Sequence, residues 1–438
     1  MFRHRWYMVG LLATLYVLSY IDRVTISLMV EPLKSEFHLS DMQMGLLMGP
    51  SFAFIFALAA LPVAWLVDRG NRKRYLVLGV ALWSICTTLS GFATSFPMLF
   101  GLRMGLAVGE AVLSPVALSM IGDLFKPYER ATPSAVYLSS APIGIVLAYV
   151  IGGAVIELAS QAWLASALGL APVASWRLSL VLVGLPGLLL ATIIAFTTQE
   201  PPRTHASPAP DSAEPQDSER FGIFASLRES LQFYAPAVSG PALLYAVSNG
   251  AVAWYPTHLI RTQGVSASVA GYIFSTALLM TAILLLTIPI FAERIARTGR
   301  RDLLMLIPLI LIPIGLGCFI LALLQSSLLF ASIFMAVGFS IISSVGAFPQ
   351  VTLPVIAPPA FRGRLMAIMA FANNVIGLGL GVFLVGFLAD TVFRGPGSIG
   401  RSLLAIVCAV GPAVWLLFFL AWKPYRAATF RQSDAPIA

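Results

Sequence analysis

Residues 96–120, FPMLFGLRMGLAVGEAVLSPVALSM, are apolar along the whole stretch except at Arg103 and Glu110. The stretch is long enough to cross the hydrocarbon core of a bilayer as one helix, which takes about 20 residues. A second such stretch, residues 7–30, contains Asp22. A charge at the bilayer centre costs about 3 kcal/mol or more, so these three side chains should face a protein interior or a water-filled path.

Similar apolar stretches recur along the whole chain. The 438 residues are 58% hydrophobic and 11% charged, whereas soluble domains carry about 25% charged residues. The fold class predicted is therefore an all-α membrane protein with twelve transmembrane helices. We expect the first stretch to be an uncleaved span, because no small-residue cleavage site follows it. The spans predicted are 7–30, 42–67, 75–94, 96–120, 134–158, 176–198, 231–259, 267–291, 303–323, 327–356, 364–392 and 401–422.

The placement of Lys and Arg predicts the orientation. Most of them lie at the termini and in the loops after even-numbered spans, and the other side has only Lys34, Arg177, Arg261, Arg394 and Arg401. The positive-inside rule then places both termini in the cytoplasm, as expected of a multi-pass protein of the cytoplasmic (inner) membrane. The same pattern explains the net charge of +8 without a nucleic-acid partner.

A segment rich in Pro, Ser and acidic residues divides the chain into two related parts. Residues 199–220 read QEPPRTHASPAPDSAEPQDSER, which is typical of a flexible linker. Acidic-basic pairs follow span 2 and span 8 alike, as expected of two six-helix halves related by a parallel repeat. We predict an N-terminal six-helix bundle over 1–198, a cytoplasmic linker over 199–225, a C-terminal six-helix bundle over 226–425 and a tail over 426–438.

The loop after span 2 carries a family resemblance. Residues 64–74, AWLVDRGNRKR, resemble the signature of the major facilitator superfamily, although Ala64 and Asn71 stand where that signature has glycine. Together with YIDR at 20–23 and GEA at 109–111, the variant is similar to the Spinster subfamily. That resemblance implies a proton-linked or facilitative carrier of lysophospholipids or sphingolipids. The anion:cation symporters, which carry sugar acids, share a similar Asp-Arg in span 1 and Gly-Glu in span 4 and are the alternative.

The intramembrane charges are predicted to meet. At ~1.5 Å per residue, Asp22 lies roughly 22 Å from the cytoplasmic end of span 1, and Arg103 roughly 10 Å from the outer end of span 4. In a core about 30 Å thick both reach one level, so we predict an Asp22–Arg103 ion pair. Glu110 is two turns further along the face of Arg103. Arg23 points about 100° away from Asp22, which leaves open an inward position or snorkelling to the outer surface.

This arrangement suits proton coupling. Burial favours the protonated form of a carboxylate, and a nearby guanidinium favours the ionised form. The hypothesis is that protonation of Asp22 or Glu110 releases Arg103 to bind an anionic head group, with protons as the coupling ion and no other cofactor. The alternative is a static ion pair that holds spans 1 and 4 together. No metal-ligand spacing, nucleophile–base pair or phosphate-binding loop points to an enzyme or to ATP.

Further charges flank the spans on the cytoplasmic side. We predict that they form a gate, in which Asp68 pairs with Arg130 or caps a helix end when that side is shut. The residues of this gate are Asp68, Arg69, Arg130, Glu293 and Arg294. The alternative, topology charges in solvent, is our interpretation for Arg72, Lys73 and Arg74.

Polar and aromatic residues inside apolar spans are candidates for the substrate cavity. Besides Arg103 and Glu110 they are Tyr20, Tyr137, Ser139, Asn249, Trp254, Asn373 and Asn374. The second half has no clear intramembrane charge, so the cavity is expected to be polar on one wall and apolar on the other. This favours an amphiphilic anion, with membrane lipids around a monomer. A sugar-acid symporter, an uncoupled scramblase or channel-like pore, and a receptor with this fold remain alternatives.

Overall fold

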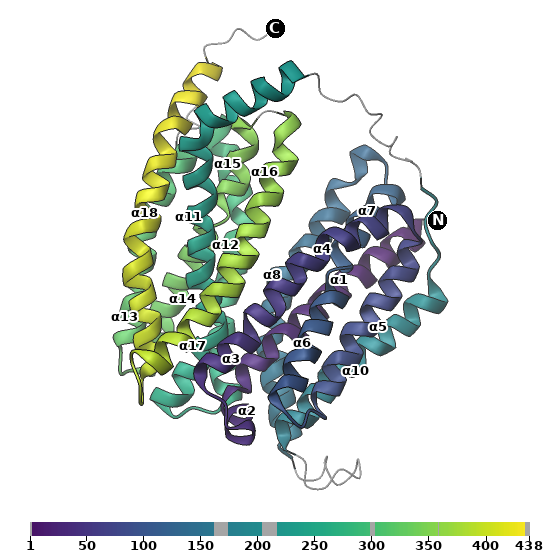
Figure 1. Ribbon diagram of the computed structural model, residues 1–438, viewed down its shortest axis with the longest axis vertical. Helices are drawn as coiled ribbons and strands as arrows, with labels where there is room; N and C mark the ends of the chain where they lie inside the picture. The colour runs from purple at the N-terminus through teal and green to yellow at the C-terminus, as the bar shows by residue number, and fades with distance from the viewer. Residues whose placement is uncertain (1, 162–173, 204–216, 298–302, 358, 434–438) are drawn as a thin grey trace. The chain divides into compact units, whose positions relative to one another are not determined.

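The computed structural model describes residues 2–161, 174–203, 217–297, 303–357 and 359–433, and these residues form helices joined by short connections (Figure 1). They cluster into two compact units. Unit 1 comprises Met1–Pro202, Asn249–Leu279 and Leu378–Leu403, and unit 2 comprises Arg203–Ser248, Met280–Gly377 and Leu404–Ala438. All of the intramembrane charges singled out above therefore belong to unit 1.

The helices before the linker lie in unit 1. They are α1 (Phe2–Val24), η1 (Thr25–Leu28), α2 (Val30–Phe37), α3 (Asp41–Met48), α4 (Pro50–Arg69), α5 (Arg72–Ser90), α6 (Phe96–Glu110), α7 (Leu113–Leu124), η2 (Pro127–Glu129), α8 (Ala131–Ala159) and α10 (Ser175–Thr197). After the linker come α11 (Asp217–Gln263), α12 (Ala267–Arg297), α13 (Leu303–Leu324), α14 (Leu328–Val345), α15 (Phe348–Ile356), α16 (Pro359–Ala372), η3 (Asn373–Leu380), α17 (Gly381–Thr391) and α18 (Ser398–Ser433).

The helices follow the predicted spans closely, and several spans are interrupted. Among the described residues, ten helical stretches are long and apolar enough to cross a membrane. The span predicted at 42–67 consists of α3 and α4, and the span at 364–392 contains the π-helical segment η3. Pro50 follows the break between α3 and α4, where a missing N–H costs nothing because first-turn amides have no helical partner.

One boundary differs from the prediction. Helix α11 begins at Asp217, inside the range predicted to be linker. The start of the linker, residues 199–203, is also described, and residues 204–216 lie outside the described part. The division into two six-helix halves stays a prediction.

Small residues bring α5 and α6 together beside the charged residues. A Cβ atom on Gly109 would lie 2.7 Å from the carbonyl oxygen of Gly79, and one on Gly79 would lie 2.8 Å from that of Gly109. Glycine at both positions thus allows backbone-to-backbone contact, a common way for membrane helices to pack. The contact fixes the position of Glu110 relative to Trp83 of α5, which is fully buried.

Arg72 corrects the prediction of solvent-exposed topology charges. Its side chain is 1% exposed, forms ion pairs with Asp123 of α7 and Glu200 of the linker, and donates to the hydroxyl of Ser119 at 3.0 Å and to the carbonyl of Pro201 at 2.8 Å. Burial lowers the pKa of Arg72, but the hydrogen bonds with Glu200 and Asp123 outweigh burial and raise it, so the guanidinium stays charged.

The next two basic residues differ from each other. The ammonium of Lys73 donates to the carbonyls of Ala195 and Thr198 at 2.8 and 2.7 Å, at the end of α10. In return, Glu200 accepts from the Lys73 amide at 2.7 Å, in the first turn of α5. A cation thus satisfies a helix C-terminus and a carboxylate satisfies a helix N-terminus. Arg74 is exposed, as expected of a topology charge.

Candidate functional site

The site is built around the end of α1. The α-helix stops at Val24 and continues as the 3₁₀ segment η1, so the last carbonyls of α1 lose their usual partners. Side chains donate to four consecutive carbonyls: Thr25 to Ile21 (2.6 Å), Arg103 to Asp22 (3.3 Å) and Arg23 (2.6 Å), and Ser27 to Val24 (2.8 Å). The helix end is therefore fully satisfied inside the membrane-spanning part of the chain.

Arg103 does not form the ion pair that the sequence predicted. Its guanidinium lies at the level of Asp22, as expected, but it bonds the backbone carbonyls of Asp22 and Arg23 and not the Asp22 carboxylate. The physical reason is the break in α1. The carbonyls that lack helical partners carry the negative end of the helix dipole, and a buried cation there caps the helix.

Glu110 pairs with Arg23, which resolves the open orientation of Arg23 in favour of the interior. Nη2 of Arg23 donates to Oε2 of Glu110, and the carboxylate side chain is 1% exposed. The Arg23 guanidinium lies 4.2 Å from the ring centroid of Phe52, and that of Arg103 lies 5.7 Å from the same centroid. Two cations thus share the π system of one fully buried phenylalanine of α4.

The Asp22 carboxylate is 4% exposed and lies beside Thr87 and Trp83 of α5. Within the described residues it forms no ion pair, and its Oδ1 atom has no hydrogen-bond partner. Oε1 of Glu110 likewise has no hydrogen-bond partner among the described residues. Buried acceptors without partners are rare in native structures and often mark functional groups. The site therefore has two acceptors that can receive a proton or a donor from a substrate.

Tyrosine side chains line one side of the charged group. The rings of Tyr16 and Tyr137 stack with centroids 4.8 Å apart, and Tyr20 lies 5.4 Å from Tyr16 and 4.9 Å from the guanidinium of Arg23. The Tyr137 hydroxyl is 3.1 Å from that of Ser114. The structure thus brings Tyr20 and Tyr137 to the charges. Ser139 is partly exposed, and its hydroxyl donates to the Val136 carbonyl of its own helix.

The remaining cavity candidates lie in other parts of the fold. Trp254 is fully buried and donates to the Val382 carbonyl at 2.9 Å, a contact that packs α11 against α17. Asn249 is half-buried on α11. Asn373 and Asn374 open η3; Oδ1 of Asn373 has no partner among the described residues, whereas Asn374 donates to the Ala370 carbonyl.

The residues of the predicted cytoplasmic gate are spread over several helix ends. Asp68 and Arg69 close α4, and the Arg69 guanidinium lies 4.4 Å from the ring of Trp65. Arg130 donates to the carbonyl of Phe125 at 3.1 Å, and the contacts of the described residues do not include a pair between Arg130 and Asp68. Arg294 is exposed on α12, and the side chain of Glu293 lies outside the described part. The gate stays a prediction.

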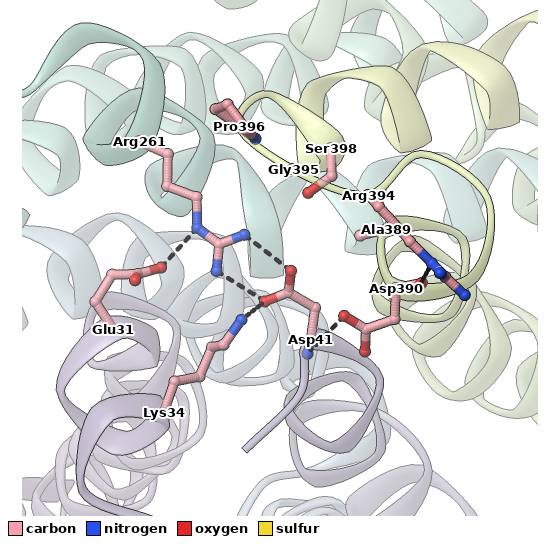
Figure 2. A pocket seen from close by; sticks show the side chains of 10 residues that line it. All are labelled: Glu31, Lys34, Asp41, Arg261, Ala389, Asp390, Arg394, Gly395, Pro396 and Ser398. Carbon is pink, nitrogen blue, oxygen red and sulfur yellow. Dashed lines mark hydrogen bonds and ion pairs between the residues drawn. The ribbon is translucent and has the colours of Figure 1, made fainter. Parts of the chain in front are cut away.

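Sequence reasoning missed a second group of charges, on the face predicted to lie outside (Figure 2). Arg261 donates to both oxygens of Asp41, at 2.9 and 2.7 Å, and to Glu31 at 2.7 Å. Lys34 also pairs with Asp41, and Asp390 accepts from the backbone amides at the start of α3. The available signal was the scarcity of Lys and Arg in these loops, which makes Lys34 and Arg261 exceptional.

Comparison with known proteins agrees with the fold. The family model of the Major Facilitator Superfamily matches residues 12–382. A crystal structure of a bacterial homologue of the human lysosomal transporter Spinster, inward-facing and unoccupied, superimposes with a TM-score of 0.79, 26% identity and 99% coverage of both chains.

Curated relatives include an MFS-type efflux pump of Mycolicibacterium smegmatis, 29% identical over 97% of this chain and 94% of its own. The sphingosine-1-phosphate transporter SPNS2 of Xenopus tropicalis is 27% identical over 94% of this chain and 78% of its own. The probable galactarate/D-glucarate transporter GudP of Bacillus subtilis is 25% identical over 62% of this chain and 61% of its own.

These findings define a multi-pass membrane transporter. The chain belongs to the Major Facilitator Superfamily, and within it the chain is Spinster-like.

Proposed function

We propose that this protein moves an amphiphilic anion, a lysophospholipid or sphingolipid, across the cytoplasmic membrane by proton-coupled alternating access. The observation that carries the proposal is the buried group of Arg23, Glu110, Asp22 and Arg103 at the broken end of α1. The likeness of the whole chain to a sphingosine-1-phosphate transporter and to a Spinster homologue supports the lipid substrate. Both termini are proposed to be cytoplasmic, and the protein to act as a monomer.

The geometry suggests a more specific switch than the sequence did. Glu110 holds Arg23, so protonation of Glu110 removes the negative partner and leaves the Arg23 guanidinium available to an anionic head group. A guanidinium suits phosphate because its planar fork offers paired donors. Arg103 keeps its bonds to the α1 carbonyls and holds the helix end in place. Deprotonation of Glu110 then restores the internal pair and expels the substrate.

Asp22 is the second candidate proton carrier. It is buried between the carbonyl bonded by Arg103 and the α5 side chains, without an ion pair of its own among the described residues. The guanidiniums of Arg23 and Arg103 carry one positive charge more than an ionised Glu110 neutralises, and an ionised Asp22 would balance that charge. Protonation of one carboxylate therefore changes the electrostatic environment of the other.

The test is flux of a fluorescent lysophospholipid and of a sphingoid phosphate in proteoliposomes, with and without an imposed pH gradient. We expect saturable flux that the gradient accelerates. Glu110→Gln should abolish the effect of the gradient, and Arg23→Met should abolish flux. Thr192→Ala is the matched control, because this exposed hydroxyl bonds only its own helix in the described structure. Equal, non-saturable flux with and without the gradient would indicate a scramblase.

A second candidate function is symport of a small organic anion. It is favoured by the relative described as a galactarate/D-glucarate transporter. The same four charged residues could bind a dicarboxylate. Uptake of galactarate in the same vesicles, combined with no flux of either lipid, would select this alternative.

A further inference from the structure

Tyr149 of α8 is a fully buried tyrosine outside the charged group at the end of α1. Its hydroxyl donates to the carbonyl of Val252 on α11 and accepts from the hydroxyl of Ser27 on η1 at 3.3 Å. All three residues belong to unit 1. One side chain therefore connects the broken end of α1, which precedes the linker in the sequence, with α11, which follows it.

The carbonyl of Val252 needs a donor from outside its own helix. In an α-helix this carbonyl would accept from the amide of residue 256, which is a proline here and has no N–H. Buried carbonyls in native structures are almost always paired, and the Tyr149 hydroxyl replaces the missing helical bond. Pro256 lies inside α11, so the bond from Tyr149 supports the helix at the position where a proline allows it to bend.

The donor to Tyr149 is part of the broken end of α1. Ser27 donates to the carbonyl of Val24 at 2.8 Å and to the hydroxyl of Tyr149 at 3.3 Å. A serine hydroxyl has one proton, so the two acceptors compete for it. A change in the position of the Val24 carbonyl therefore changes the hydrogen bond that Tyr149 receives.

Close packing ties α8 to its neighbours on both sides. A Cβ atom on Gly152 of α8 would lie 3.1 Å from Oγ1 of Thr25 on η1, and one on Gly271 of α12 would lie 2.9 Å from the carbonyl oxygen of Tyr149. The rings of Tyr149 and Phe274 meet edge to face, with centroids 5.3 Å apart. Because the backbones are this close, a movement of η1 also moves α8 and with it the Tyr149 hydroxyl.

The charged group holds the residues that lead into η1. Arg103 bonds the carbonyls of Asp22 and Arg23, directly before Val24, and Arg23 pairs with Glu110. The charged groups around Glu110 are thus Arg23 and Asp22 of α1 and Arg103 of its own helix. Protonation of Glu110 removes the anionic partner of Arg23, and the end of α1 then loses one of the contacts that fix it.

We propose that Tyr149 is a positioning residue that couples protonation of Glu110 to movement of α11 at Pro256. The inference rests on the proposed function and adds how the proton site reaches a helix on the other side of the linker in the sequence. While Glu110 is ionised, the bond from Tyr149 to Val252 holds α11. When the end of α1 shifts, this bond weakens and α11 bends at Pro256.

The experiment follows α11 directly, without substrate. Hydrogen–deuterium exchange of the amides around Pro256, residues 253–262, is measured by mass spectrometry on the full-length protein in nanodiscs. Glu110→Gln represents the protonated carboxyl group. Tyr149→Phe removes the hydroxyl and keeps the ring against Phe274. The two changes are made singly and together, as a double-mutant cycle.

We expect Glu110→Gln to accelerate exchange in this segment about tenfold, the effect of losing one hydrogen bond. Tyr149→Phe should accelerate it as well, and Glu110→Gln should then add less than about twofold, because the two changes act through one bond. Tyr7→Phe is the matched control, since the Tyr7 hydroxyl lies 2.9 Å from that of Thr197, near the opposite end of α1. In this background Glu110→Gln should keep its full effect.

Pro256→Ala separates coupling from stability. It supplies Val252 with a helical donor, so it should restore the melting temperature that Tyr149→Phe lowers. It should not restore the response of α11 to Glu110→Gln. Recovery of both in the combined variant would mean that Tyr149 only stabilises α11, and would overturn the proposal.

Two other results would also overturn it: no response of α11 to Glu110→Gln in the otherwise unchanged protein, or a full response in Tyr149→Phe. The exchange measurement uses no substrate, so it is independent of the transported compound. Non-additive exchange in a protein that moves none of the tested lipids would support the role of Tyr149 and count against the proposed substrate alone.

Discussion

Replacement of Arg23 by methionine should destabilise the protein strongly, because it leaves Glu110 buried without its partner. The Glu110 side chain is 1% exposed, and Arg23 is the residue with which it forms an ion pair in the described structure. Methionine retains the aliphatic part of the side chain but not the guanidinium that lies over the Phe52 ring, so the change mainly removes charge, hydrogen bonds and this cation–π contact. The effect is therefore electrostatic rather than a cavity in the core.

The magnitude follows from the burial. Removing one partner of a buried ion pair costs about 3–5 kcal/mol, whereas an exposed pair contributes about 0–1 kcal/mol. Arg23 is 16% exposed, which places Arg23→Met near the lower end of the first range, at about 3 kcal/mol. Arg5 provides the exposed comparison, since it lies 3.9 Å from Glu129 with side chains 26% and 42% exposed. Arg5→Met should cost less than about 1 kcal/mol.

The assay is the free energy of unfolding of purified protein in mixed micelles, measured by denaturant titration for the four members of a double-mutant cycle. Arg23→Met combined with Glu110→Gln should recover most of the loss, because no uncompensated charge is then buried. Equal unfolding free energies of Arg23→Met and Arg5→Met, or a double variant no more stable than Arg23→Met alone, would contradict an uncompensated buried charge at Glu110.

Two further predictions concern packing. Arg72→Met should cost about 3 kcal/mol in unfolding free energy and increase trypsin cleavage of the linker, because the buried contacts with Glu200 and Pro201 are lost; exposed Arg74→Met should do neither. Gly109→Ala should cost about 1–3 kcal/mol by overpacking against the Gly79 carbonyl, whereas Gly101→Ala, which meets no atom within 4 Å, should be neutral in the same unfolding assay. Wild-type stability in either Arg72→Met or Gly109→Ala would contradict the corresponding contact.

The overall architecture could be predicted because it depends on hydropathy, which is local in sequence. Long apolar stretches have few stable alternatives to helices in a membrane, and the family match agrees. The common level of Asp22 and Arg103 also followed from the rise of a helix. Their pairing could not be predicted in this way, since it depends on the break after Val24. The residues Thr25 and Ser27, whose hydroxyls satisfy carbonyls there, were the available signal.

The other discrepancies come from long-range contacts. The sequence predicted that Arg72 is a solvent-exposed member of a basic cluster. It is buried because Glu200, which is distant in sequence, accepts a hydrogen bond from its guanidinium. The bidentate ion pair of Arg261 with Asp41 likewise joins a residue after the linker to one before it in the sequence. No periodicity or local composition encodes such pairs. Net charge and topology rules place these side chains on a face but do not select their partners.

We propose that protonation of Glu110 is coupled to the movement of an anionic lysolipid. The most direct measurement is proton flux across proteoliposomes, read by an internal pH dye, when a lysophospholipid gradient is imposed without a pH gradient. We expect lipid-dependent proton movement in the wild-type protein that is lost in Glu110→Gln and kept in Thr192→Ala. Lipid flux with no accompanying proton movement, or proton movement equal in wild type and Glu110→Gln, would contradict it.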